Sequence, residues 1–196
     1  MKVSIAVPAY NEERNIGPLL DSLRAQRTAT AEIVEIVVVA SGCTDRTADI
    51  VRERQARPGV PIVLLEESER RGKVAAINTY LSQRHPYVEA ICVSSADLII
   101  SPEVIERLVR CLVENPDVGM CGGRPVPTNG YSSFAGLATR FLWDMHHRVA
   151  LDVDAPPAGT PRTKASSAAL IARSAASRPR NTASCSTLGS SPYHSR

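Results

Sequence analysis

Apolar residues along the first 150 positions alternate between short continuous runs and helical repeats. The runs predict strands at residues 3–7, 33–39, 61–65, 90–93 and 118–121. Apolar positions three and four apart predict helices at 14–27, 44–54, 72–81, 102–114 and 132–151. Strands that alternate with helices of this length are typical of βαβ units with right-handed crossovers. The pattern therefore predicts an α/β fold with a mainly parallel sheet.

The composition changes at residue 155. Residues 155–196 contain no acidic residue, 13 Ser or Thr and five Pro, with only three large aliphatic residues, Leu170, Ile171 and Leu188. Such a segment buries too little apolar surface to offset the entropy lost on ordering. We therefore predict a domain over 1–154 and a disordered tail over 155–196. A second hypothesis is that the chain is truncated and the tail an out-of-frame reading of a GC-rich gene, which the same tail in relatives would refute.

Charge and cysteine spacing argue against a nucleic-acid-binding protein and against a disulfide-bonded one. Residues 1–154 hold all 20 acidic residues and 17 of the 23 Lys and Arg, so the body is close to neutral and lacks a nucleic-acid-binding footprint. The five cysteines form no C-x-x-C pair, and Cys92 and Cys121 lie in apolar runs, which favours buried, reduced thiols. No leader pattern or bilayer-spanning apolar run is present, so we expect a cytoplasmic protein, with peripheral membrane association left open.

Four polar segments follow predicted strands: 8–12, 40–45, 70–73 and 95–97. The carboxyl ends of parallel strands are where ligands collect in open α/β sheets. In the first segment Pro8 is expected to end the strand, because it has no N–H to donate. Tyr10 then offers a ring on which a base can stack. The alternative is a turn in which Asn11 caps the following helix, as Thr44 would cap the next one, with Asp45 a helix-start residue.

The third segment has the composition of a phosphate-binding turn. Gly72 allows a close backbone approach, and the helix that follows presents free N–H groups to an anion. Arg71 and Lys73 carry charges that can neutralise a diphosphate. A basic surface turn is the alternative, but the position between a strand and a helix favours phosphate binding.

Taken together, the four segments resemble the family 2 glycosyltransferases over roughly residues 2–150. That family uses the GT-A fold, a three-layer α/β sandwich, to transfer a sugar from a nucleotide-diphosphate donor. The resemblance implies a UDP- or GDP-sugar as partner, with the acceptor unknown. It assigns base and ribose binding to Pro8, Ala9, Tyr10 and Glu12, and diphosphate binding to Arg71, Gly72 and Lys73.

Two motifs depart from the family pattern, at Ala40 and Ser41 and at Ser95. Where the family has an acidic pair, this chain has Ala40 and Ser41, so the resemblance places Ser41 against the base as a neutral acceptor. The acidic-x-acidic motif reads Ser95-Ala96-Asp97. Asp97 occupies the position that binds Mg²⁺ or Mn²⁺ in the family, where the cation bridges the diphosphate oxygens.

The sequence offers few candidates for the residues that would act on the acceptor. An inverting transfer needs a base for the acceptor hydroxyl, and the last acidic candidates are Asp152 and Asp154, so we assign no catalytic residue. Asp144, His146 and His147 are interpreted as a solvated helix face.

The alternative function is a truncated, inactive nucleotide-sugar-binding module. A pyrophosphorylase is disfavoured because the first loop is not Gly-rich, and a dinucleotide-dependent oxidoreductase because no G-x-G-x-x-G follows the first strand.

Overall fold

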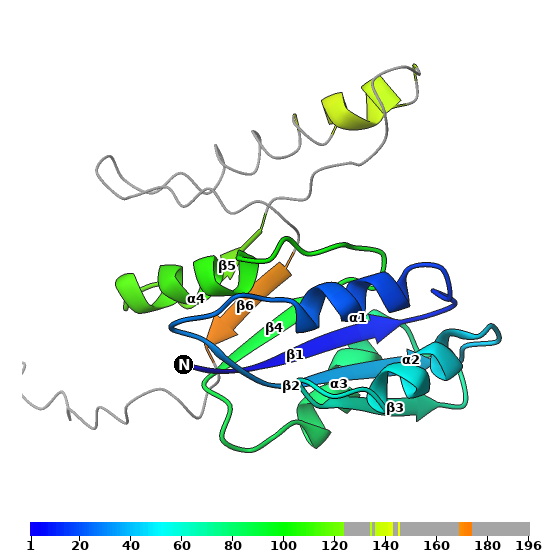
Figure 1. Ribbon diagram of the computed structural model, residues 1–196. Helices are drawn as coiled ribbons and strands as arrows, with labels where there is room; N and C mark the ends of the chain where they lie inside the picture. Colours follow the sequence, from blue (N-terminus) through cyan, green and yellow to red (C-terminus); the bar gives the residue numbers. More distant parts are fainter. Residues whose placement is uncertain (124–133, 135, 143–144, 146–168, 174–196) are drawn as a thin grey trace, which may run out of the picture.

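The computed structural model of the chain describes residues 1–123, 134, 136–142, 145 and 169–173. These residues form a sheet with helices on both of its faces (Figure 1). The strands are β1 Lys2–Ala9, β2 Glu32–Ser41, β3 Ile62–Glu67, β4 Ala90–Ser94, β5 Met120–Gly122 and β6 Ala169–Arg173. The helices are α1 Ile16–Arg24, α2 Thr47–Gln55, α3 Lys73–Gln83 and α4 Val104–Glu114.

The six strands lie in the order β3-β2-β1-β4-β6-β5. β1 pairs in parallel with β2 on one side and with β4 on the other, and β2 pairs in parallel with β3. β6 is antiparallel to both β4 and β5. The predicted α/β fold with a mainly parallel sheet is therefore confirmed, with one antiparallel strand inserted near its edge.

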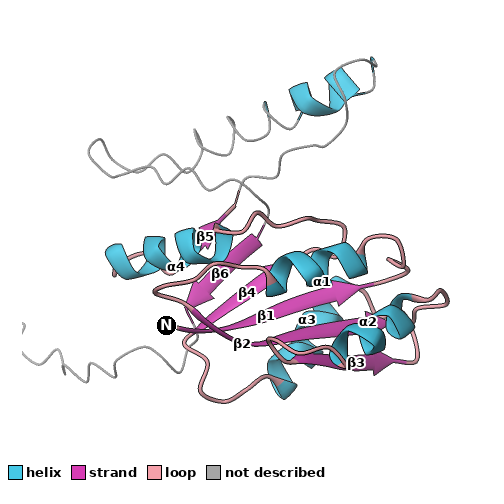
Figure 2. Cartoon of the chain, viewed as in Figure 1, coloured by secondary structure: helices cyan, strands magenta, loops and turns pink. Residues whose placement is uncertain are grey.

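Alternation along the strands separates two apolar layers. Val3, Ile5 and Val7 of β1 pack with α1, α2 and α4 in one cluster of buried side chains. Ala6 packs on the opposite face, with Val37, Val39, Ala76 and Tyr80. α3 therefore covers one face while the other helices cover the other, as Figure 2 shows. This arrangement follows from period-two alternation in strands whose two faces are both covered.

A chain of hydrogen bonds crosses the α3 side of the sheet. The Tyr80 hydroxyl donates to Ser4 Oγ at 2.8 Å, and Ser4 Oγ donates to Glu35 Oε1 at 2.7 Å. The same carboxylate oxygen accepts from the backbone N–H of His85 at 2.8 Å. Burial raises the pKa of Tyr80 to about 12, so its hydroxyl remains a donor at neutral pH. The buried polar side chains of Ser4, Glu35 and Tyr80 thus all have hydrogen-bond partners.

Several element boundaries differ by a few residues from the sequence-based expectation, and three of them have a physical reason. β1 continues through Pro8 to Ala9, because pairing with β2 extends to Ala9 while pairing with β4 stops at Ala6. The missing N–H of Pro8 therefore does not end the strand. Asn11 does not cap α1, whose N-cap is Asn15. α4 begins at Val104 rather than at 102, after Pro102.

Part of the predicted disordered tail belongs to the sheet. Residues 169–173 form β6, and Ile171 is fully buried between its register partners Cys92 and Cys121. The expectation of disorder is wrong for this segment because a five-residue strand needs only a short apolar run. The rest of 155–196 lies outside the described residues.

Cys92 and Cys121 are buried, as their apolar surroundings in the sequence predict, and neither forms a disulfide. Burial raises the pKa of the Cys92 thiol to about 12, so it is protonated and unreactive at neutral pH.

The predicted helix over 132–151 is described in part. Residues 134, 136–142 and 145 are helical, and several of their large apolar side chains are exposed, including Phe134, Phe141 and Met145. Asp144, His146, His147, Asp152 and Asp154 lie outside the described residues. Among the helices that are described, none has both the length and the apolar character needed to cross a bilayer.

Replacing Tyr80 by Phe should lower the free energy of unfolding by about 1 kcal/mol, because Ser4 Oγ loses a buried donor. Urea denaturation of the full chain measures this change. Tyr87→Phe is the matched control, since Tyr87 is 75% exposed and should show almost no change. Equal losses in the two variants would contradict a stabilising role for the buried chain of hydrogen bonds.

Replacing Ile171 by Ala should lower the free energy of unfolding by about 2–5 kcal/mol, the usual cost of truncating a fully buried aliphatic side chain. Ile99→Ala serves as the control, because Ile99 is 70% exposed. Indistinguishable denaturation curves for the two variants would show that β6 does not contribute to the folded sheet.

Candidate functional site

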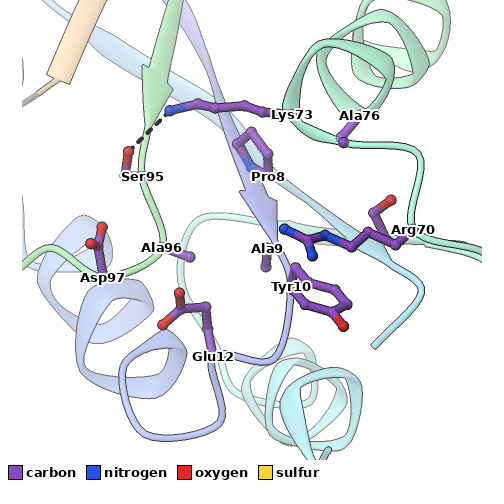
Figure 3. A pocket seen from close by; sticks show the side chains of 12 residues that line it. Pro8, Ala9, Tyr10, Glu12, Arg70, Lys73, Ala76, Ser95, Ala96 and Asp97 are labelled. Carbon is purple, nitrogen blue, oxygen red and sulfur yellow. Dashed lines mark hydrogen bonds between the residues drawn. The ribbon is translucent and has the colours of Figure 1, made fainter. Parts of the chain in front are cut away.

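A pocket of about 330 Å³ opens at the carboxyl ends of β1 and β4 (Figure 3). Its lining comes from segments far apart in sequence: Pro8, Ala9, Tyr10, Glu12, Ser41, Arg70, Gly72, Lys73, Ala76, Ser95, Ala96 and Asp97. β1 leads to β2 and β3 on one side of the sheet, whereas β4 lies on its other side. The pocket therefore occupies the point at which the strand order reverses, the usual ligand position in such sheets.

Eight of the nine predicted binding residues line this pocket. They are Pro8, Ala9, Tyr10, Glu12, Ser41, Gly72, Lys73 and Asp97. The exception is Arg71, whose place is taken by Arg70. The backbone N–H of Arg71 donates to Ser41 Oγ at 3.1 Å, which fixes the turn so that the preceding residue lines the pocket. Two adjacent arginines carry no sequence signal for which one lies inward.

The start of α3 forms a cationic side of the pocket. Gly72 has φ 85°, a conformation that favours glycine, and it precedes the first residue of the helix. No side chain caps α3, so the N–H groups of its first turn remain available to an anion. Lys73 Nζ donates to Ser95 Oγ at 3.1 Å. This bond holds the lysine charge across the pocket, toward the end of β4.

An aromatic ring and a guanidinium group lie at another part of the pocket. The guanidinium carbon of Arg70 lies 4.1 Å from the centroid of the Tyr10 ring. Figure 3 shows the arginine extended over this ring. Tyr10 is partly exposed, so the ring offers a flat surface together with a delocalised positive charge.

Two carboxylates lie on the side opposite Arg70. Figure 3 shows Glu12 and Asp97 flanking Ala96. Glu12 Oε2 accepts from Asn15 Nδ2 at 2.8 Å, and its backbone N–H donates to Thr47 Oγ1 at 2.7 Å. Asp97 is exposed to solvent. The Glu12 side chain is thus oriented from the start of α1, while Asp97 extends from the loop after β4.

The donor set around Asp97 fits a divalent cation only with help from a ligand. Within the described part of the chain, no group of three or more His, Cys, Asp or Glu side chains could hold a metal ion. Mg²⁺ and Mn²⁺ take oxygen ligands, and Mg²⁺ commonly combines one or two carboxylates with phosphate oxygens and waters. Asp97 suits such a shared site, in which a diphosphate completes the coordination.

Hydrogen bonds connect the loop after β1 with the loop after β2 beside the pocket. Asn11, at φ 52°, accepts from the backbone N–H of Thr44 at 2.8 Å and donates to its hydroxyl at 3.1 Å. Thr44 is therefore a partner of the first loop and not a helix cap. The Asp45 carboxylate accepts from the backbone N–H groups of Glu13 and Thr47, each at 3.0 Å. The Thr47 hydroxyl also donates to this carboxylate, at 2.6 Å, and these hydrogen bonds lower the pKa of Asp45. Asp45 thus lies just before α2 and bonds to its first residue.

Ser41 connects the pocket to β3. Its hydroxyl donates to Glu67 Oε2 at 2.6 Å, and the other carboxylate oxygen accepts from Thr79 Oγ1 at 2.6 Å. Gly42 follows at φ 61°, and a Cβ placed on it would lie 2.4 Å from the backbone nitrogen of Arg70. The loops after β2 and β3 therefore pack directly against each other. Glu67 was missed by sequence reasoning because nothing but strand register connects it with Ser41.

Comparison with known protein families decides what kind of chain this is. Residues 4–155 match Glycosyl transferase family 2. The chain belongs to this family. Its fold agrees with that expected from the resemblance in sequence, and its pocket occupies the strand ends at which the family motifs were recognised.

Curated relatives match only part of their own length. An undecaprenyl-phosphate 4-deoxy-4-formamido-L-arabinose transferase of Edwardsiella ictaluri is 34% identical over 116 residues, which cover 59% of this chain and 35% of that protein. The protein of the same name from Pseudomonas paraeruginosa is 32% identical, over 59% of this chain and 34% of that protein. The chain thus spans about a third of the length of these relatives.

Similar solved structures also match most of this chain but only part of their own length. The mannosyltransferase PcManGT of Pyrobaculum calidifontis, in complex with GDP-Man and Mn²⁺, is 30% identical with a TM-score of 0.53, covering 69% of this chain and 37% of that one. TarS 1-349 of S. aureus, in complex with UDP-GlcNAc, is 25% identical with a TM-score of 0.55, covering 68% of this chain and 37% of that one.

Proposed function

We propose that this chain forms the donor-binding half of a glycosyltransferase that uses a nucleotide-diphosphate sugar. The observation that carries the proposal is the pocket at the reversal of strand order, which joins an aromatic ring, two cations and two carboxylates. The aromatic ring matches the base of the donor, the cations match the diphosphate, and a carboxylate matches the ribose hydroxyls. The similar solved structures with GDP-Man and with UDP-GlcNAc support this class of ligand.

The diphosphate would lie against the start of α3. Lys73 contributes a point charge there, and the N–H groups of the first helical turn add hydrogen-bond donors. Arg70 can reach the same phosphates or remain on Tyr10, because its guanidinium group lies within the same pocket. The base would stack on the guanidinium group of Arg70 or, once Arg70 turns to the phosphates, on the Tyr10 ring that it covers. Glu12 would accept hydrogen bonds from the ribose hydroxyls.

Asp97 would hold a divalent cation shared with the diphosphate. Bound Mg²⁺ or Mn²⁺ supplies Lewis-acid stabilisation of the negative charge that develops on the leaving nucleotide. The loop after β4 brings Asp97 to the pocket, which supports this role, and Ser95 in the same loop accepts a hydrogen bond from Lys73. The Mn²⁺ present with PcManGT supports this assignment by analogy.

Transfer itself requires a base for the acceptor hydroxyl. We propose an inverting reaction, in which a carboxylate takes the acceptor proton as the hydroxyl oxygen attacks the sugar carbon and the nucleoside diphosphate leaves. The described residues provide the donor side of this reaction. Donor binding without transfer in a full-chain assay would favour the alternative, an inactive nucleotide-sugar-binding module.

Calorimetric titration of the full chain with UDP-, GDP- and dTDP-sugars tests donor binding. We expect at least one to bind and Lys73→Ala to weaken that binding about 10- to 100-fold, the effect of losing one charged hydrogen bond. Lys2→Ala is the matched control, because Lys2 lies at the opposite end of β1. Absence of heat with all three classes of sugar nucleotide would overturn the proposed function.

Repeating the titration with and without Mn²⁺ tests the role of Asp97. Mn²⁺ should tighten donor binding in the unmodified chain and have little effect in Asp97→Ala, because that variant lacks the pocket carboxylate that would hold the cation. Asp117→Ala provides the control, since Asp117 is an exposed carboxylate outside the pocket. Unchanged metal dependence in Asp97→Ala would refute the assignment.

A further inference from the structure

The Tyr10 ring of the pocket is covered by the side chain of Arg70. The guanidinium carbon lies 4.1 Å from the centroid of the ring, and Figure 3 shows the arginine over the ring face. Two flat groups in contact lie about 3.5–4 Å apart, so a base between them would need about 7–8 Å. The face of Tyr10 that Arg70 covers therefore accepts a base only after Arg70 has moved.

The Arg70 guanidinium group has no ion pair and no hydrogen bond among the described residues, although it carries five N–H donors. Arg70 is exposed to solvent. A cation–π contact at an exposed site favours the covered ring only about two- to fivefold. The ring is then uncovered in about a sixth to a third of the molecules, so a stronger partner can displace the arginine.

The backbone of Arg70 is fixed, so its side chain alone has to move. A Cβ placed on Gly42 would lie 2.4 Å from the backbone nitrogen of Arg70 and 3.0 Å from its Cα, which shows how closely the loop after β2 packs against it. The next backbone N–H, that of Arg71, donates to Ser41 Oγ at 3.1 Å. Arg70 therefore turns about its side-chain bonds while its Cα keeps its place beside the pocket.

The start of α3 lies close to the same side chain. Gly72 follows Arg70 by two residues, so their Cα atoms are at most about 7 Å apart. Lys73 and the uncapped N–H groups of the first helical turn attract an anion to this place. Charge-assisted hydrogen bonds between a guanidinium group and phosphate oxygens shift an equilibrium about tenfold or more. They outweigh the cation–π contact, so a diphosphate would draw Arg70 away from Tyr10.

We infer that Arg70 covers the base-stacking ring until a diphosphate takes its guanidinium group, and that it thereby makes the pocket selective for nucleotides that carry a diphosphate. This inference rests on the proposed function and specifies how the ligand is selected. A nucleoside alone has to displace Arg70 from the ring, whereas a nucleoside diphosphate supplies the anion that removes it. Arg70 is thus a specificity-determining residue, and the base and diphosphate parts of the pocket are coupled through it.

Binding of the separate parts of the ligand tests this coupling. Calorimetry of the full chain with UDP, GDP and dTDP first identifies the base that binds most tightly. The nucleoside of that base is then titrated by NMR, with Mg²⁺ held constant, in the absence of pyrophosphate and at saturating inorganic pyrophosphate. We expect pyrophosphate to tighten nucleoside binding about three- to sixfold, because it uncovers the ring in all molecules.

Arg70→Ala should have opposite effects on the two parts of the ligand. The variant uncovers Tyr10, so the nucleoside should bind about three- to sixfold more tightly and no longer respond to pyrophosphate. The variant also lacks a cation, so pyrophosphate alone should bind about tenfold more weakly. A loss of folded protein cannot imitate the tighter binding of the nucleoside.

Arg71→Ala is the matched control. It removes the same charge from the same turn, but Arg71 does not line the pocket, so nucleoside affinity and its response to pyrophosphate should stay unchanged. Tyr10→Leu removes the ring itself, and adding Arg70→Ala to that variant should bring no gain in nucleoside binding. An equal gain in the presence and absence of Tyr10 would contradict the coupling through this ring.

The outcomes distinguish this inference from the proposed function. Unchanged or undetectable nucleoside binding in Arg70→Ala would overturn the inference and leave donor binding intact. Weaker nucleoside binding in that variant would also overturn it, because the base would then stack on the guanidinium group. A nucleoside affinity of the unmodified chain that does not respond to pyrophosphate would overturn it as well. Failure of every nucleoside diphosphate and sugar nucleotide to bind would instead overturn the proposed function.

Discussion

Parallel pairing on both sides of β1 is the constraint on which the rest of the structure depends. Parallel neighbours require each connection to return the chain to the same end of the sheet, so the loops after β1, β2, β3 and β4 meet at one edge. The direction of strand addition changes between β3 and β4, which places α3 on the face opposite α1. The pocket lies between these two helix starts.

This constraint also explains how the site remains ordered without a metal-binding cluster in the described residues. The loops are held by bonds between segments, such as Asn11 with Thr44 and Ser41 with Glu67, rather than by a shared cation. Below them, the buried chain from Tyr80 through Ser4 to Glu35 connects α3 with β1 and β2. The same three elements supply five of the twelve lining residues, Pro8, Ala9, Ser41, Lys73 and Ala76, so packing and site geometry are coupled.

Sequence reasoning predicted what depends on local pattern. Apolar runs predicted the strands, and Gly72 before Lys73 predicted a helix start that the structure places at the pocket. Sequence reasoning failed where contacts between residues far apart in the sequence determine the position of a side chain or strand. The inward arginine is Arg70 because the backbone of Arg71 bonds to Ser41, and Glu67 is important only through strand register. β6 was missed because a Ser- and Ala-rich composition, averaged over 155–196, hides a short apolar run around Ile171.

The neutral residue at position 95 changes the electrostatics of the diphosphate end. Lys73 Nζ donates to the Ser95 hydroxyl, and among the described residues no carboxylate lies within ion-pair distance of it. A carboxylate at position 95 would compensate the lysine charge before any ligand arrived. With serine, that charge stays uncompensated by position 95. In the donor complex that we propose, part of the phosphate neutralisation therefore moves from a metal with two carboxylates to Lys73 and the start of α3.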